Sequence, residues 1–143
     1  HERQMGMLIT GADCPAVFLG SESKLAALHC GWRPVAAGLI EKGAAEFQGE
    51  RFEAVIGPGI CQDHFEVGLE VIQEMGADGV AHSDGRQLNL KAIIETRLRR
   101  AGAAHVHVVD RCTYCEPEYF FSHRRDNGVT GRQGVVVRLP EAP

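Results

Sequence analysis

A cysteine and a histidine in the first third of the chain have side chains that can bind a metal or carry out nucleophilic catalysis. Cys14 stands in the segment A-D-C-P and His29 in the segment H-C-G-W-R. Between them lie two short apolar runs, 16–19 and 25–28, separated by G-S-E-S, which predicts a β-hairpin. A turn centred between Ser21 and Glu22 would place Cys14 directly opposite His29.

That pairing would suit two kinds of chemistry. Opposed hairpin residues have Cβ atoms about 4.5–5.5 Å apart, so a thiolate and an imidazole could share a zinc ion at about 2.0–2.3 Å. The imidazole of His29 could instead act as the base for a nucleophilic Cys14 thiol. A structural interpretation, with Cys14 as a small buried hydrophobe and His29 as a core histidine, fits the spacing equally well. Asp13, Trp32 and Arg33 lie at the same strand ends, which favours a functional site.

A basic segment near the C-terminus could bind an anion. It reads F-F-S-H-R-R-D over 120–126 and T-G-R-Q over 130–133. Guanidinium groups beside hydroxyls and glycine fit a phosphate or carboxylate, although a surface network of arginine–aspartate ion pairs explains the same charges. Glu66 is expected in the first turn of a helix over Val67, Val71 and Met75, where a carboxylate suits the helix dipole in any case.

Two further pairs of metal-ligand residues have simpler explanations. Cys112 and Cys115 form a C-x-x-C pair, but a zinc ribbon needs a second such pair and the chain has none. Proline and aromatic residues follow Cys115, which does not fit the helix of a thioredoxin motif, so we interpret both as reduced cysteines near the site or in the core. His105 and His107 share one face of an expected strand, and their alternation favours a solvated face over a metal pair.

The remaining periodicity predicts a mixed α/β fold that positions these residues. Apolar residues at four-residue spacing predict a helix that begins at Pro34 and continues to Phe47. Another helix is capped by Asn89 and has Gly102 just past its end. Its inner face would be Leu90, Ile93, Ile94 and Leu98. Strands are predicted over 52–56, 105–109 and 134–139.

Length and composition limit the class of protein. With 143 residues the chain is expected to form a single domain over 1–143, and 44% hydrophobic with 24% charged residues excludes disorder. The formal net charge of −4 argues against nucleic acid as a partner, and no apolar run is long enough for a membrane span. Five cysteines, an odd number with no signal peptide before them, predict reduced thiols and a cytoplasmic location.

Four segments, taken together and in order, resemble the motifs of one bacterial family. They are A-D-C-P-A-V, H-C-G-W-R, I-G-P-G-I-C-x-x-x-F-E-V-G and C-T-Y-C…F-F-S-H-R-R-D…T-G-R-Q. From about Leu8 to Leu139 the chain is similar to the laccase-domain family, also called multicopper polyphenol oxidase-like. Its members are described as zinc-dependent purine nucleoside phosphorylases with adenosine deaminase activity. The resemblance implies a four-layer α/β/β/α sandwich with mixed sheets.

The resemblance also implies a metal site. The family holds zinc, or copper in its older description, through a His, Cys, His set whose last two members match Cys14 and His29. The first ligand belongs to a family segment upstream of His1, so the family domain is expected to begin before this chain. The usual H-A-G-W-R-G reads here as H-C-G-W-R-P, and the extra thiol of Cys30 should point away from His29.

The implied reactions assign roles to further residues. The partners would be phosphate and a purine nucleoside (adenosine, inosine, guanosine or methylthioadenosine), bound by a monomer or homodimer. Three protein ligands would leave zinc an open position for a water that attacks C6 of adenine, with Asp13 moving protons. Phosphorolysis needs phosphate held against the ribose carbon as the purine leaves. The candidates for substrate binding are Arg33, Glu66, Ser122 and Arg125.

Three other functions remain open from the sequence. A metal-free hydrolase or amidase, for example one that edits peptidoglycan precursors, would use Cys14 as nucleophile and His29 as base. Copper-dependent polyphenol oxidation needs many histidine ligands, of which only His29 can be placed. A non-catalytic binding module is the third, because two ligands hold zinc less well than three.

Overall fold

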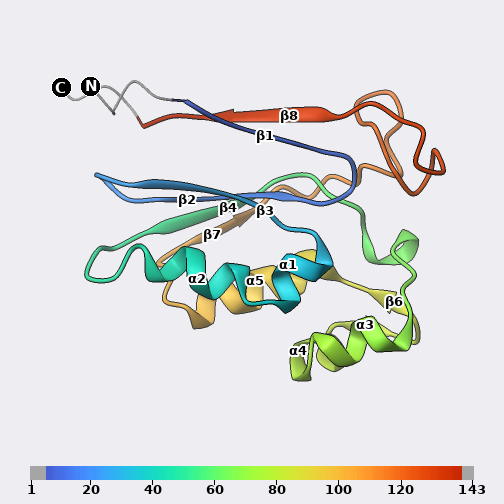
Figure 1. The fold of residues 1–143 in the computed structure, drawn as a ribbon, viewed down its shortest axis with the longest axis horizontal. Coiled ribbons are helices and arrows are strands. Elements are labelled where there is room, and N and C mark those ends of the chain that lie inside the picture. Colours follow the sequence, from blue (N-terminus) through green and yellow to red (C-terminus); the bar gives the residue numbers. More distant parts are fainter. Residues whose placement is uncertain (1–5, 140–143) are drawn as a thin grey trace.

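A four-stranded mixed sheet forms the centre of the fold, which the computed structural model describes over residues 6–139 (Figure 1). In spatial order its strands are β3 (Leu25–His29), β2 (Ala16–Gly20), β4 (Glu53–Ile56) and β7 (Val106–Val108). β2 pairs antiparallel with β3 and with β4, whereas β4 and β7 run parallel. The predicted mixed α/β class is confirmed.

Helices cover one face of this sheet and a second sheet covers the other (Figure 1). The helices against the sheet are α1 (Trp32–Ala36), α2 (Leu39–Ala45) and α5 (Leu90–Arg100). On the opposite face, β1 (Met7–Gly11) and β8 (Gln133–Val137) pair antiparallel as a two-stranded sheet. The described residues therefore form helix, sheet and sheet layers of the expected sandwich.

The short remaining elements lie beyond one end of the sheet. They are the 3₁₀ turn η2 (Gln62–His64), the helices α3 (Leu69–Glu74) and α4 (Ala77–Ala81), and the strands β5 (Ser83–Asp84) and β6 (Gln87–Leu88). Sequence periodicity predicted a helix around Val71 but neither of the two-residue strands. Within residues 6–139, no helix has the length and apolar character needed to cross a membrane.

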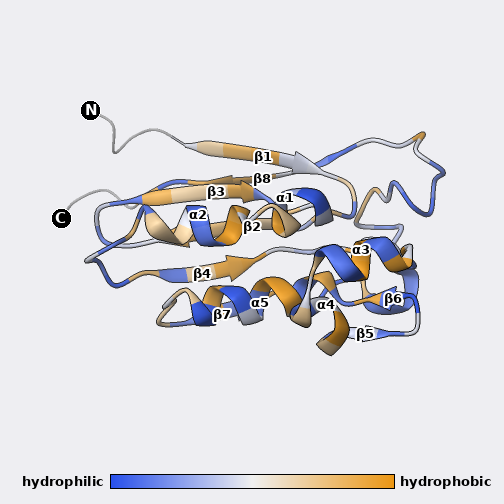
Figure 2. Ribbon diagram, turned by 60° about the horizontal axis from the view of Figure 1, so that its bottom comes forward, coloured by the Kyte–Doolittle hydropathy of each residue, from blue (hydrophilic) through white to orange (hydrophobic). Residues whose placement is uncertain are grey.

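The core lies between the four-stranded sheet and its helices. β2 has four buried residues in a row because both of its faces are covered. Val17 and Leu19 are fully buried, and so are Ile40 of α2 and Ile93 of α5. Figure 2 shows hydrophobic residues along β4 and on α5. Burial of these aliphatic side chains, at about 1.5–3 kcal/mol each, is the main force that holds the two layers together.

The predicted α5 is confirmed, whereas the predicted helix over 34–47 is interrupted. The side chain of Asn89 accepts a hydrogen bond from the backbone N–H of Ala92 at 3.0 Å, and Gly102 follows the helix with a φ of +96°. Between α1 and α2, Gly38 has a φ of +83°. A left-handed residue ends an α-helix, so the apolar spacing continues through two short helices rather than one.

The β2–β3 hairpin has a different register from the predicted one. Ala16, not Cys14, lies opposite His29, and four residues connect the strands. The Ser21 N–H donates to the Lys24 carbonyl at 2.9 Å, and the Ser21 Oγ accepts from the Lys24 N–H at 3.0 Å. These bonds close a four-residue loop where the prediction assumed a two-residue turn. β2 is thus displaced by two residues along β3, which preserves the face on which each side chain lies.

A buried ion pair joins α5 to the short helices. Arg97 and Asp78 are each only 8% exposed, and Arg97 Nε donates to Asp78 Oδ2 at 2.9 Å. The other guanidinium nitrogens donate to the carbonyls of Val35 at 2.7 Å and Met75 at 3.0 Å. Hydrogen bonds from Arg100 and then Arg97 lower the pKa of the Asp78 carboxyl despite its burial. One guanidinium group therefore connects α1, α3, α4 and α5.

Replacing Arg97→Ala should lower the free energy of unfolding by about 3 kcal/mol, because it leaves a buried carboxylate and two buried carbonyls without this partner. Arg99→Ala on the same helix is a matched control. The Arg99 side chain is 57% exposed and pairs with Glu95 at the surface, so its loss should cost about 0.5 kcal/mol or less. Urea denaturation followed by circular dichroism measures both, and equal losses would contradict this account.

Candidate active site

A pocket of about 320 Å³ lies where the ends of β1, β2 and β3 meet the segment 120–132. Its walls are formed by Gly11, Ala12, Asp13, Cys14, His29, Ile60, Phe65, His123, Arg124 and Arg132. Small-molecule sites range from about 300 to 1,000 Å³, so this volume suits a small ligand. The structure therefore brings Cys14 and His29 to one pocket although they are not directly opposite in the hairpin.

Two glycines leave space for these side chains. A Cβ on Gly31 would lie 3.2 Å from Cys14 Sγ, and a Cβ on Gly11 would lie 3.5 Å from His29 Cε1. The Gly31 approach is closer than an ordinary van der Waals contact, so a larger residue there would displace the Cys14 side chain. Cys14 is a free thiol, and within the described residues no hydrogen bond joins it to His29. Both residues therefore line the pocket without a hydrogen bond between them.

Cys14 and Cys30 differ in how deeply their side chains are buried. Burial, followed by the charge of Asp13, raises the pKa of the Cys14 thiol, while Arg132 acts in the opposite direction. Cys30 is fully buried on the other side of the strand, as predicted, and burial raises its pKa to about 12. Cys30 is therefore an inert core residue. A cation bound beside Cys14 would favour its thiolate, since the thiolate is the form that binds metals.

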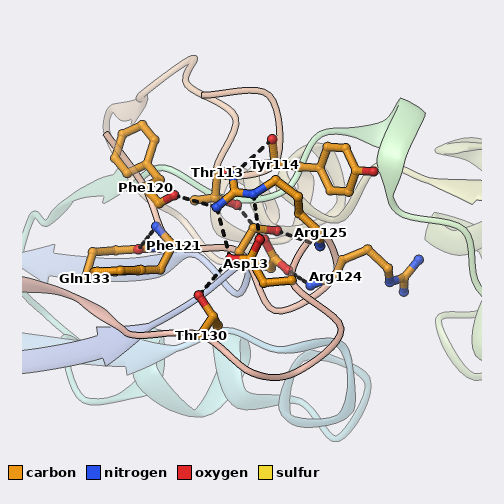
Figure 3. A network of polar contacts seen from close by, with 11 residues as sticks. Asp13, Thr113, Tyr114, Phe120, Phe121, Arg124, Arg125, Thr130 and Gln133 are labelled. Atoms are coloured by element: carbon orange, nitrogen blue, oxygen red, sulfur yellow. Dashed lines mark hydrogen bonds and ion pairs between the residues drawn. The ribbon is translucent and has the colours of Figure 1, made fainter. Parts of the chain in front are cut away.

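Asp13 connects the pocket to the segments that follow β7. Its φ of 82° is a left-handed conformation that aspartate adopts more readily than most residues. The side chain is buried, and Oδ1 accepts from the Thr113 hydroxyl at 2.7 Å (Figure 3). Oδ2 accepts from the Arg124 backbone N–H at 2.7 Å. Both carboxylate oxygens are engaged with the protein, and the role of Asp13 in proton transfer stays a prediction.

The Arg125 side chain binds backbone carbonyls of its own loop and does not line the pocket. Nη1 donates to the carbonyls of Thr113 at 2.9 Å and Tyr114 at 3.2 Å, and Nη2 donates to that of Phe120 at 2.9 Å (Figure 3). Nε and Nη2 also donate to the Asp126 carboxylate. All five N–H donors of the guanidinium therefore have protein acceptors, which leaves none for a phosphate in this arrangement.

The other three predicted substrate-binding residues also lie outside the pocket lining. Ser122 is fully buried, and its Oγ accepts a backbone N–H from its own loop at 3.2 Å. Arg33 is exposed, and its guanidinium lies 4.4 Å from the centre of the Trp32 ring. Glu66 is exposed and precedes α3 rather than occupying its first turn, because the helix begins after a Gly68 N-cap.

The cations that do line the pocket are Arg124 and Arg132. Arg124 Nη1 donates to the Glu66 carbonyl at 2.9 Å, and its guanidinium lies 5.5 Å from the centre of the Phe65 ring. Arg132 Nη1 donates to the Gly131 carbonyl at 2.8 Å. Both arginines are exposed, and each guanidinium has further N–H donors that these bonds do not use. The basic segment therefore turns toward the pocket through arginines other than the one predicted.

A second group of metal-ligand residues lies outside this pocket. The ligand atoms of Cys61, His64, Cys112 and Cys115 all lie within 4.8 Å of one another. The C-x-x-C pair thus does have a partner pair, the C-x-x-H of residues 61–64, because a histidine can stand where a second C-x-x-C would have a cysteine. His105 and His107 are both exposed, in agreement with the predicted solvated strand face.

A depression of about 610 Å³ beside the β2–β3 loop is larger but has no comparable chemistry. It is lined by Gly20, Ser21, Glu22, Glu50, Arg51 and Glu53. This lining contains no thiol or imidazole, and its three glutamates outnumber its one arginine, which opposes a phosphate ligand. The smaller pocket is therefore the candidate active site.

Comparisons with known proteins all find similarity to one protein family. A family model described as multi-copper polyphenol oxidoreductase laccase matches residues 1–140. The chain is 37% identical over 139 residues to the purine nucleoside phosphorylase YfiH of Shigella flexneri, covering 90% of this chain and 57% of that protein. It is 34% identical over 148 residues to the adenosine deaminase RL5 of an unknown prokaryotic organism, covering 87% and 54%. The chain thus spans little more than half the length of these relatives.

A solved structure extends the agreement to the fold. The crystal structure of Neisseria meningitidis protein NMB0706 superposes with a TM-score of 0.85 at 31% identity. The match covers 95% of this chain and 61% of that one. The arrangement of layers described above is therefore shared with a larger protein.

The bond between Thr113 and Asp13 should contribute measurably to stability. Thr113→Val keeps the shape of the side chain but leaves a buried Asp13 oxygen without a donor, which should cost about 1–3 kcal/mol. Thr10→Val, at an exposed position of β1, is the matched control and should change the free energy of unfolding by about 0.5 kcal/mol or less. Chemical denaturation distinguishes them, and a Thr113→Val protein as stable as the control would refute the role of this bond.

Proposed function

Because the chain belongs to the multi-copper polyphenol oxidoreductase laccase family, we propose that the protein containing it cleaves purine nucleosides with phosphate and also deaminates adenosine. Relatives carrying the names purine nucleoside phosphorylase and adenosine deaminase support both reactions. The observation that carries the proposal is the composition of one pocket. It combines a thiol and an imidazole with two arginines and an aromatic ring, which suits a phosphate and a nucleoside together.

The donor set of this pocket fits zinc. Cys14 and His29 offer one thiolate sulfur and one imidazole nitrogen, which are common zinc ligands in proteins. A catalytic zinc site uses three protein ligands, and we propose that a residue outside this chain supplies the third, as the family resemblance implies. Zinc, when bound, would supply Lewis-acid polarisation of the reacting groups. Gly11 and Gly31 help to fix the two side chains at the pocket by leaving room for them.

We assign phosphate binding to Arg124 and Arg132 instead of Arg33 and Arg125. Both line the pocket, and a guanidinium can donate two parallel hydrogen bonds to phosphate oxygens. Phe65 lines the same pocket and offers a flat apolar surface for a purine. Arg124 lies over the Phe65 ring, so the proposed phosphate and base positions are adjacent.

For Asp13 the contacts favour a positioning role over proton transfer. Its carboxylate accepts the backbone N–H of Arg124 and so fixes where that residue enters the pocket wall. It also directly precedes Cys14, and its left-handed conformation sets the direction in which the chain continues to the thiol. A change at Asp13 would therefore act on the reaction through Cys14 and Arg124.

Removing the proposed ligands should abolish activity. In the full-length protein, Cys14→Ala and His29→Ala should each lower phosphate-dependent release of hypoxanthine from inosine by at least about a hundredfold, because ligand loss disrupts the metal site. Cys30→Ala is the matched control, since that thiol lies in the core away from the pocket. A coupled assay for hypoxanthine measures all three, and a Cys14→Ala protein with unchanged activity would refute the assignment.

The two sets of arginines can be compared in the same assay. Arg132→Ala should raise the KM for phosphate about tenfold, equivalent to one charge-assisted hydrogen bond of about 1.4 kcal/mol. Arg33→Ala should change this KM by less than about twofold, because the side chain lies on Trp32 outside the pocket. The opposite ranking would restore the assignment predicted from sequence.

A further inference from the structure

The second group of cysteines and histidine arises from the topology of the sheet. β4 and β7 are parallel neighbours, so the segments that leave their C-terminal ends emerge at the same edge. Gly59 and Cys112 form a parallel bridge beyond the two strands, and the Thr113 N–H donates to the Gly59 carbonyl at 3.3 Å. This bridge aligns the C-x-x-H of residues 61–64 with the C-x-x-C of residues 112–115. Two ligand pairs that are about fifty residues apart in sequence thus converge.

The distances within this group match a tetrahedral metal site. Two sulfurs at about 2.3 Å from a tetrahedral zinc ion are roughly 3.8 Å apart, and a sulfur and an imidazole nitrogen are roughly 3.5 Å apart. Cys61 Sγ and Cys115 Sγ are 3.9 Å apart. His64 Nδ1 lies 3.2 Å from Cys61 Sγ and 3.4 Å from Cys115 Sγ. The fourth ligand atom, on Cys112, lies within 4.8 Å of the others.

The surroundings also hold these groups in place. The backbone N–H of Cys61 donates to Cys112 Sγ at 3.2 Å, the type of bond that supports a thiolate ligand. The His64 ring stacks on Tyr114, with ring centres 4.0 Å apart and planes inclined by 15°. The stacking fixes the orientation of the imidazole, whose Nδ1 faces the two sulfurs. An unconstrained surface group of thiols would have neither feature.

We propose that Cys61, His64, Cys112 and Cys115 bind one zinc ion as a structural site, separate from the Cys14 and His29 pair. Four protein ligands complete a tetrahedral shell and leave no position for a substrate, which is typical of structural zinc. Three thiolates and one imidazole favour zinc over harder cations. On binding, the three thiols release their protons to solvent and zinc keeps its oxidation state, so no redox partner is needed.

This zinc site would fix one wall of the active-site pocket. Phe65, the residue after His64, lines the pocket. Arg124 Nη1 donates to the backbone carbonyls of His64 at 3.4 Å and Glu66 at 2.9 Å. The segment 64–66 therefore contains one of the proposed zinc ligands and also accepts hydrogen bonds from a pocket arginine. Loss of zinc should loosen this wall without removing a residue of the pocket. The inference does not rest on the proposed reaction, because metal binding is measured directly.

The test uses the full-length protein with Cys14→Ala and His29→Ala together, which removes the first donor pair. We expect this double variant, purified without added metal, to retain about one equivalent of zinc by mass spectrometry of metals. Adding Cys112→Ala or His64→Ala should reduce zinc to background, whereas adding Cys30→Ala should leave it unchanged. A double variant without zinc, or one whose zinc survives Cys112→Ala, would overturn the proposal.

A second measurement does not depend on the cluster variants folding. Alkylation of the native double variant, followed by peptide mass spectrometry, reports each thiol separately. Cys61, Cys112 and Cys115 should be protected as purified and should become reactive together after a zinc chelator is added. Cys30 should stay protected in both states, because it is fully buried. Thiols that react equally with and without chelator, or a Cys61–Cys115 disulfide in the purified protein, would contradict a zinc site.

Discussion

Backbone hydrogen bonds at one edge of the four-stranded sheet link the segment of Asp13 and Cys14 to the segments that follow β3, β4 and β7. At this edge β2 begins, β3 ends, and the parallel strands β4 and β7 end. The Cys30 N–H donates to the Pro15 carbonyl at 3.0 Å, and the Ile60 N–H donates to the Asp13 carbonyl at 3.0 Å. The bridge between Gly59 and Cys112 continues this alignment outward. Because the pairing of four strands sets these contacts, the pocket and the zinc ligands depend on the same sheet register.

Asp13 extends this alignment from the backbone to the side chains. Its two carboxylate oxygens bind Thr113, which stands within the C-x-x-C segment, and the backbone of Arg124, which enters the pocket wall. A buried carboxylate with both oxygens satisfied is costly to disturb, because each lost partner leaves a desolvated charge. The left-handed backbone at Asp13 is therefore supported by these hydrogen bonds in addition to the local preference of aspartate for this conformation. Asp13, for which the sequence predicts proton transfer, thus also holds two distant segments together.

Sequence patterns predicted the elements better than the contacts between them. Asn89 and Gly102 act locally, so the ends of α5 could be predicted from residue type alone. The hairpin register failed because it depends on how Ser21 bonds Lys24, and either a two-residue or a four-residue loop fits the apolar pattern. The charge of Arg125 predicts a phosphate ligand, but the carbonyls that surround it come from a loop whose path no periodicity encodes. Cys14 and His29 reach one pocket because a displacement by two residues preserves the face of each side chain.

The environments of the five cysteines show why a count of thiols could not assign their roles. Cys30 alternates with His29 along one strand, so it is directed into the core and its pKa rises to about 12. Cys14 lines the pocket, and the missing Cβ of Gly31 leaves room for its sulfur. The remaining three meet only because β4 and β7 are parallel neighbours, a pairing between distant segments that spacing cannot reveal. The pair Cys14 and His29 and the four proposed zinc ligands thus lie at one sheet edge. The segment that includes Phe65 connects the two groups, so loss of the proposed zinc ion should alter the pocket wall.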